Sequence, residues 1–264
     1  MERPNAWKGY TNAQLDELEA FAQDYIAFIS QNKTERECVR TAVELAEAAG
    51  YRNLDELVAS GEQLVAGARV YAVLRGKTMI LVELGSRPLT EGFNILGAHV
   101  DSPRLDVKQN PLEEKNDLAF LDTHYYGGVK KYQWVTMPLA LHGVVAKRDG
   151  SVVPVCIGED ASDPVFVISD LLIHLAQEQL QKKATEVIDG EMLDVLVGGR
   201  PLVVKDGDKD EAKDPVKAML LEVVKEHYDI EEEATLHLVL RSQGMHIFAK
   251  LLSGKIVTDR KSVV

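Results

Sequence analysis

Apolar and polar residues alternate with helical spacing near the start of the chain and predict two amphipathic helices. Each predicted helix is preceded by a capping box, in which side chains satisfy backbone N–H groups: Thr11 with Gln14, and Thr34 with Glu37. Gly50 is expected to end the second helix. The apolar positions of the two helices are Leu15, Leu18, Phe21, Ala22, Tyr25 and Phe28, followed by Val39, Val43, Ala46 and Ala49.

The residues that follow carry β-strand patterns. Residues 68–85 contain two β-rich runs around Gly76 and Lys77, which predicts a hairpin, and the apolar residues 93–100 predict a further strand. The middle of the chain then shows short strands separated by turns. These strands are expected within residues 105–111, 119–128, 135–150 and 152–158, with one turn at Asp149 and Gly150.

Helical spacing returns in the last third of the chain. Residues 168–184 predict a helix capped by Ser169 or Asp170, and residues 215–229 predict another with proline in its first turn. Residues 235–240 alternate as a strand does. Leu171, Leu172, Leu175 and Leu180 are expected on or near one face of the first of these helices. Helices and strands are mixed along the chain, so we expect an α/β protein.

Composition narrows the possible classes of function and partner. The 264 residues are 45% hydrophobic, enough for one large domain or two smaller ones. A net charge of −12 repels phosphate backbones and anionic membranes, which argues against nucleic-acid and membrane partners. No apolar run is long enough to span a bilayer, about 18 residues. Cys38 and Cys156 are far apart, which favours neither a disulfide framework nor a zinc knuckle and fits a cytoplasmic location.

A polar cluster follows the predicted strand at residues 93–100. Residues two apart in a strand project to the same side, so His99 and Asp101 are expected side by side where the strand ends. A nearby carboxylate can fix the ring orientation of a histidine that binds a metal. In open α/β folds, sites collect at the carboxyl ends of strands. This triplet alone is more often a strand end with a structural histidine.

Longer segments resemble a known family. "GAHVDSPRLDVKQNP" at residues 97–111 resembles the first metal-ligand motif of the aspartyl aminopeptidase and vacuolar aminopeptidase I family, whose members are cocatalytic zinc exopeptidases. "HYYGGVKKYQW" at residues 124–134 resembles the Tyr-Gly-Gly segment of that family, and "ISDLLIHLAQ" at residues 168–177 resembles its Leu-x-Ile-His-Leu segment. The motifs occur in the family's order, and the resemblance covers residues 1 to about 233.

The resemblance implies a fold and a site. Residues 1–103 would be the N-terminal part of a zinc-exopeptidase α/β domain, residues 104–226 an inserted β-rich dimerisation domain, and residues 227–264 a divergent tail. His99 would bind one of two divalent ions, and Asp101 would be the catalytic carboxylate that orients the site. Zinc is the implied metal, with manganese or cobalt as alternatives. The implied protein is a cytoplasmic homo-oligomer that releases N-terminal residues, often acidic ones, from peptides.

The chain departs from the family's pattern in the predicted helix at residues 168–184. Many relatives carry a Pro-His pair just before the Leu-x-Ile-His-Leu segment, and its histidine reaches the active site of a neighbouring subunit. The aligned residues here are Ser169 and Asp170, so no contribution by that route is expected. His174 lies among leucines and is expected to be a structural helix residue.

The rest of the family's site is expected downstream of the insert. It comprises a bridging aspartate, a Glu-Glu pair, a further acidic ligand and a final histidine, and nothing after Glu233 matches them. The alternative hypothesis is therefore a truncated or frameshifted, inactive fragment that acts at most as an oligomerisation module. Glu231, Glu232 and Glu233 are interpreted as a solvated charge run, and His237 and His246 are not placed in the site.

The charged stretch at residues 205–215 resembles a calcium loop that starts at Asp206. Glu211 stands where the loop needs glycine, and Lys217 stands where it needs a bidentate glutamate. Calcium binding is therefore not expected there.

Overall fold

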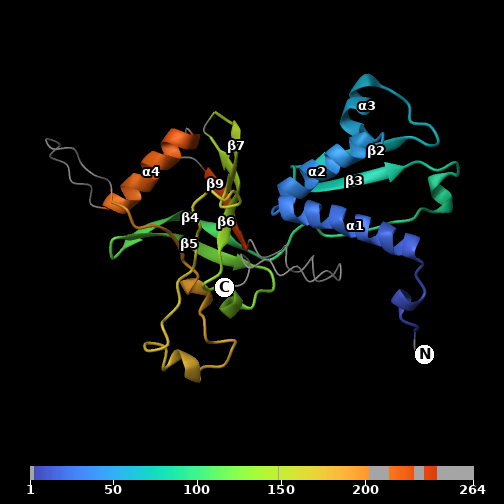
Figure 1. Ribbon diagram of the computed structural model, residues 1–264. Helices are drawn as coiled ribbons and strands as arrows, with labels where there is room; N and C mark the ends of the chain where they lie inside the picture. The colour runs from blue at the N-terminus through green and yellow to red at the C-terminus, as the bar shows by residue number, and fades with distance from the viewer. Residues whose placement is uncertain (1–2, 148, 202–213, 229–234, 243–264) are drawn as a thin grey trace. The chain divides into compact units, whose positions relative to one another are not determined.

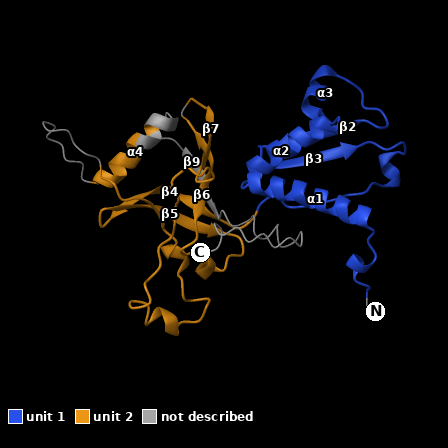
Figure 2. Ribbon diagram, viewed as in Figure 1, with its two compact units in different colours: residues 1–101, 245–263 blue, residues 102–244, 264 orange. Residues whose placement is uncertain are grey.

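The chain forms two compact units, each described by itself. The computed structural model describes residues 3–147, 149–201, 214–228 and 235–242 (Figure 1). The first 101 residues belong to unit 1, and the described residues from Ser102 onward belong to unit 2 (Figure 2). Residues 206–211 of the charged stretch, where calcium binding was not expected, lie outside the described residues, as do the glutamates at 231–233 and His246.

Unit 1 contains the two predicted helices, α1 (Asn12–Gln31) and α2 (Glu35–Ala48). A shorter helix, α3 (Leu54–Ser60), follows them. Both predicted capping boxes are confirmed, with the Thr11 and Thr34 side chains accepting hydrogen bonds from the backbone N–H groups of Gln14 and Glu37. The second helix ends just before Gly50, whose φ of 85° is the left-handed conformation that favours glycine.

A three-stranded sheet completes the regular structure of unit 1. Its strands are β1 (Arg52–Asn53), β2 (Arg69–Leu74) and β3 (Thr78–Glu83), in the order β1-β2-β3. The β2–β3 hairpin confirms the prediction, and its turn places Arg75 and Gly76 at φ 54° and 65°. One short 3₁₀ helix, η2 (Leu89–Glu91), follows β3.

The strand predicted at residues 93–100 is wrong. This segment forms no regular element, and its side chains are exposed. A strand exists only when a neighbour accepts and donates its backbone hydrogen bonds. Among the residues that the structure describes, none pairs with this segment, which explains why the apolar pattern alone misled.

Unit 2 is built on a six-stranded antiparallel sheet in the order β7-β6-β9-β4-β5-β8. The strands predicted from the middle of the chain are confirmed, as is the turn at Gly150, whose N–H donates to the carbonyl of Lys147. The strands are β4 (Arg104–Lys115), β5 (Leu118–Tyr126), β6 (Leu139–Ala146), β7 (Val152–Ile157), β8 (Val195–Gly198) and β9 (Thr235–Ser242).

Strand β9 lies inside this sheet. The strand predicted at residues 235–240 is thus confirmed, and it pairs with β6 on one side and β4 on the other. Helix α4 (Pro215–Tyr228) confirms the predicted helix, and the Glu114 carboxylate accepts hydrogen bonds from two N–H groups at its start, those of Val216 and Lys217. Unit 2 therefore continues beyond residue 226 as far as β9.

The helix predicted at residues 168–184 is wrong. The segment forms turns and one 3₁₀ helix, η4 (Gln179–Gln181), and its leucines are exposed. The residues just before it are held in extended conformation by bridges from Phe166 to Leu139 and from Val167 to Leu196. A helix with such spacing is stabilised mainly by the packing of its apolar face against the rest of the protein. Here the leucines of that face are 54–70% exposed, whereas Ile168 and Ala176 of the same segment are buried.

The hydrophobic core of unit 2 lies against the sheet. A buried hydrogen bond of 2.6 Å, donated by the Thr123 hydroxyl to the carbonyl of Leu193, ties β5 to this core. Leu105, at the start of β4, is fully buried. The core comprises Leu105, Leu139, Leu141, Val145, Val155, Phe166, Ile168, Leu193 and Val195. No helix among the described residues is long and apolar enough to cross a membrane.

We predict that Gly190→Ala destabilises unit 2. Gly190 begins η5 (Gly190–Met192), and a Cβ there would lie 2.5 Å from the Tyr125 ring. Such overpacking costs about 1–3 kcal/mol, which urea unfolding would measure. Gly128→Ala is the control, because a Cβ at Gly128 meets no atom within 4 Å. Equal stability of the two variants would contradict this packing.

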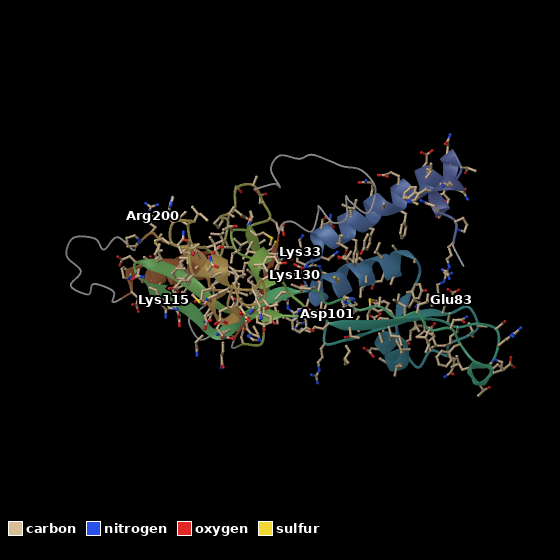
Figure 3. All side chains as sticks on the ribbon, turned by 90° about the horizontal axis from the view of Figure 1, so that it is seen from below. Lys33, Glu83, Asp101, Lys115, Lys130 and Arg200 are labelled. Atoms are coloured by element: carbon tan, nitrogen blue, oxygen red, sulfur yellow. The ribbon has the colours of Figure 1, made fainter. Side chains whose placement is uncertain are left out.

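We also predict that Asp194→Asn stabilises the protein at neutral pH. Burial raises the pKa of the Asp194 carboxyl, and although Lys115, labelled in Figure 3, opposes this shift, Asp122 adds to it. One carboxylate oxygen is buried without a hydrogen-bond partner, and the other is 3.6 Å from the Lys115 ammonium. Because the folded pKa is raised, ionisation of Asp194 opposes folding at pH values above that pKa. The increase in the free energy of unfolding caused by Asp194→Asn, measured by urea unfolding, should therefore be largest at pH 7 and shrink as the pH falls. An increase that does not depend on pH would contradict this.

Candidate metal-ligand site

The candidate site lies at the end of unit 1. His99 and Asp101 belong to the extended segment that follows η2, and Figure 3 labels Asp101 in that position. Proline at 103 disfavours helical conformation at Ser102, so the backbone stays extended up to β4. The segment therefore presents His99 and Asp101 on an open stretch of chain, even though the predicted strand is absent.

The structure brings the two predicted site residues together. The Nδ1 atom of His99 is 2.7 Å from the carbonyl oxygen of Asp101 and 3.2 Å from its carboxylate Oδ1. A carbonyl oxygen can only accept, so the hydrogen lies on Nδ1, and the tautomer with Nδ1–H carries its lone pair on Nε2. The His99 side chain is 83% exposed and that of Asp101 is 38% exposed. Asp101 thus orients an imidazole whose second nitrogen remains accessible.

This arrangement fits one ligand of a metal ion. Histidine that binds zinc commonly donates its other ring N–H to a carboxylate or a carbonyl, as His99 does here. The described residues contain no group of three or more His, Cys, Asp or Glu side chains that could hold an ion. Two-metal hydrolysis also needs a bridging ligand and a base. The described part of the chain therefore supplies one histidine ligand and its orienting aspartate, which are too few for two-metal hydrolysis.

Three histidines of unit 2 whose side chains the structure describes have other surroundings. His142 is buried in β6, with its Nε2 atom 3.0 Å from the Glu159 carboxylate, and His124 stacks on Tyr125. His174 was expected to be a structural helix residue, and this is wrong, because it lies exposed in a segment of turns. The Asp170 carboxylate accepts hydrogen bonds from the Leu171 N–H and the Gln179 side-chain amide, so it stabilises the local turn structure.

Two segments that carried the family resemblance pack against each other within unit 2. Arg104, which follows the Ser-Pro pair, is paired in register with Tyr126 of the Tyr-Gly-Gly segment. Its guanidinium lies 3.9 Å from the centre of the Tyr126 ring, and its Nε donates to Asp106 at 2.6 Å. Gly127 has φ 82°, and a Cβ there would lie 3.5 Å from Pro103. These contacts fix the start of β4 immediately after the His99–Asp101 segment.

Sequence reasoning missed Arg104 and Tyr126. They are 22 positions apart, and only the β4–β5 register places them together. A usable signal exists in retrospect: a basic residue directly after the Ser-Pro pair, and an aromatic residue directly before a Gly-Gly pair at the end of the next predicted strand. Such a pair suits a cation–π contact.

Comparison with known proteins identifies the lineage of the chain. The family model described as aminopeptidase I zinc metalloprotease (M18) matches residues 28–245, which includes β9. A probable M18 family aminopeptidase 1 of Clostridium acetobutylicum is 56% identical over 232 residues, which are 88% of this chain and 49% of that protein. A probable M18 family aminopeptidase 1 of Thermotoga maritima is 40% identical over 233 residues, covering 88% of this chain and 48% of that protein.

Solved structures agree with the sequence comparison. An M18 family aminopeptidase from Thermotoga maritima superposes with a TM-score of 0.81 at 37% identity, covering 92% of this chain and 51% of that one. Aminopeptidase I from Clostridium acetobutylicum gives a TM-score of 0.78 at 52% identity, covering 90% and 52%. The chain spans about half the length of the curated relatives it matches. With the α/β fold of these structures and a family match over most of its length, the chain belongs to the aminopeptidase I zinc metalloprotease family, M18.

Proposed function

We propose that this chain supplies the N-terminal half of a zinc-dependent aminopeptidase, with His99 as a metal ligand and Asp101 as the carboxylate that orients it. The observation that supports this most is the His99 Nδ1 hydrogen bond to Asp101, which leaves Nε2 accessible in a chain 56% identical to a probable M18 aminopeptidase. When bound, the metal would polarise the scissile carbonyl and activate a water molecule. The chain's own contribution is to hold the imidazole in one tautomer and orientation.

The finer features of the activity rest on the family resemblance. The proposed substrates are peptides, from which N-terminal residues, acidic ones among them, are released. The proposed site holds two divalent ions, zinc first and manganese or cobalt as alternatives. Only His99 and Asp101 of this chain are assigned to it; the bridging aspartate, the Glu-Glu pair and the final histidine would come from the half that the chain does not match.

Unit 2 is proposed to be the inserted domain and to make a homo-oligomer in the cytoplasm. Leu171, Leu172, Ile173 and Leu175 are between 54% and 70% exposed and form an apolar stretch that only His174 interrupts. Contiguous exposed apolar surface is typical of protein–protein interfaces. The acidic composition, with a net charge of −12, argues against nucleic acid and anionic membrane as partners of this surface.

A second function has its own supporting observation. The described residues hold no set of ligands sufficient for a metal ion, and the chain covers 49% of its Clostridium relative. In that case the part of the protein described here would be inactive by itself, and its remaining activity would be oligomerisation through unit 2. The two functions predict opposite results in one assay.

The assay measures release of N-terminal Asp, Glu or Leu from short peptides with added zinc, manganese or cobalt. The chain would be tested alone and co-expressed with the part of the Clostridium acetobutylicum relative that the match leaves uncovered. The proposed aminopeptidase function predicts metal-dependent release by the co-expressed pair and none by the chain alone. A co-purified but inactive pair would overturn it. Metal-dependent turnover by the chain alone that is lost in His99→Ala would overturn the fragment function instead.

A further inference from the structure

Cys156 lies in the outermost strand of the unit 2 sheet, directly opposite a buried histidine. Strand β7 stands at one end of the strand order and pairs with β6 (Figure 1). In this register Cys156 is the partner of His142. Side chains directly opposite each other in an antiparallel pair project to the same face, with Cβ atoms about 4.5–5.5 Å apart. Because Cys156 is exposed, the structure presents an accessible cysteine beside an imidazole.

The carboxylate of Glu159 orients the ring of His142. The Nε2 atom of His142 is 3.0 Å from this carboxylate, and the His142 side chain is only 2% exposed. An ionised carboxylate can only accept, so Nε2 donates, and the tautomer with Nε2–H carries its lone pair on Nδ1. A histidine oriented in this way can take a proton from a thiol, and the carboxylate then stabilises the imidazolium. Cys156, His142 and Glu159 therefore form a nucleophile, a base and an orienting carboxylate.

A tight turn after β7 positions Glu159. Gly158 has φ 103°, and a Cβ there would lie 3.1 Å from the Cα of Ala140 in β6, so the turn approaches β6 more closely than a side chain allows. The Gly158 N–H donates to the Asp163 carboxylate at 2.8 Å, which stabilises the turn. Ala140 lies two positions before His142 and on the same face of β6. The backbone of this turn therefore holds Glu159 beside His142.

The turn at residues 158–163 is acidic. Its charged residues are Glu159, Asp160 and Asp163. Backbone and side-chain hydrogen bonds from Ser162 lower the pKa of Asp160 below its usual value, so this carboxyl is ionised at neutral pH. A concentration of negative charge attracts cationic small molecules and repels anionic ones. A reagent that reaches Cys156 past this turn is therefore favoured when it is neutral or cationic.

We propose that Cys156 is a reactive thiol, activated by His142 and Glu159, that forms mixed disulfides with small neutral or cationic disulfides. The thiol proton passes to Nδ1 of His142, and the Cys156 sulfur bonds to one sulfur of the small disulfide. The S–S bond of the small disulfide breaks, and the leaving thiolate takes the proton from the imidazolium. Cys156 is thereby oxidised, and half of the small disulfide is released as a thiol. Excess thiol reverses the exchange. This inference does not depend on aminopeptidase activity.

The other cysteine of the chain provides an internal comparison. Cys38 lies in α2 and is partly buried, with its Sγ atom 3.9 Å from the carbonyl oxygen of Asn32. A carbonyl acceptor favours the protonated thiol, whereas the thiolate is the nucleophile. Cys38 is therefore expected to react more slowly than Cys156.

The test measures the reaction of each cysteine separately with cystamine, a cationic disulfide, at pH 7. The Cys38→Ser chain reports on Cys156, and the Cys156→Ser chain reports on Cys38, because the sequence has two cysteines. Mass spectrometry follows formation of the mixed disulfide. Cys156 should react at least about tenfold faster than Cys38. With the anionic 5,5′-dithiobis(2-nitrobenzoate), the rate at Cys156 should be lower than with cystamine, relative to the rates of each reagent with a small thiol.

Two variants of the Cys38→Ser chain separate activation from simple exposure. His142→Ala and Glu159→Gln should each slow the reaction of Cys156 at pH 7 by at least about tenfold. Near pH 10, where an exposed thiol ionises without help, the variants should react as fast as their parent, to within about twofold. A change in accessibility alone would instead alter the rate at both pH values.

Controls make the outcome decisive. His124→Ala changes a histidine of β5 that is 60% exposed and should leave the rate at Cys156 unchanged. Circular dichroism should confirm that the variants fold as their parent does. Because His142 is buried, Glu159→Gln decides the result if His142→Ala fails to fold. An unchanged rate in Glu159→Gln at pH 7, or a rate reduced equally at pH 7 and near pH 10, would overturn the proposal.

Discussion

His99→Ala is expected to lower metal-dependent turnover of the co-expressed pair by roughly 10³-fold. Loss of a partner that merely orients a metal ligand costs about 10–100-fold, and loss of the ligand itself should cost more. The structure gives no substitute, because no other histidine of the described chain lies in the extended segment with Asp101. Peptide release under saturating zinc measures the effect.

Two variants serve as controls for His99→Ala. Asp101→Asn keeps the backbone carbonyl that accepts from the His99 ring and removes only the carboxylate, so its loss should fall within about 10–100-fold. His174→Ala removes an exposed histidine of unit 2 and should leave turnover unchanged. If His99→Ala were as active as His174→Ala, His99 would not be a ligand.

Leu105→Ala is expected to lower the free energy of unfolding of unit 2 by about 2–5 kcal/mol, the cost of a large-to-small change in a buried core. Leu105 is completely buried and packs in the core cluster of that unit. Hydrogen exchange would show faster opening of β4, β5 and β6, while α2 and the β2–β3 hairpin of unit 1 would exchange at unchanged rates.

The control for Leu105→Ala is Val165→Ala, which truncates a side chain that is 62% exposed and should change stability by less than about 0.5 kcal/mol. The comparison also tests the proposed division of the chain into a peptidase part and an inserted domain. Equal loss of protection in both units would mean that they unfold as a single cooperative body, contrary to that division.

Local features of this fold could be predicted from the sequence. The capping boxes at Thr11 and Thr34 involve residues three positions apart, and the β2–β3 hairpin is closed by a turn of a few residues. Their geometry depends on neighbours in the chain, which is why pattern and propensity were sufficient. The His99–Asp101 contact belongs to the same class, since the two residues are two positions apart.

Features that depend on distant partners could not be predicted in the same way. Residues 93–100 have a strand's composition but no described neighbour to pair with, and residues 168–184 have a helix's spacing but no described surface for their leucines. The cation–π contact of Arg104 with Tyr126 exists only through the β4–β5 register. Tertiary context decided all three cases.

We propose that His99 is one ligand of a metal site and that the described part of this chain holds too few ligands to complete it. Zinc retained through gel filtration, measured per polypeptide by atomic absorption, tests it most directly. We predict negligible zinc on the chain alone, bound zinc on the co-expressed pair, and a loss of bound zinc in the pair that carries His99→Ala. Tight zinc binding by the chain alone that is unchanged by His99→Ala would contradict the claim.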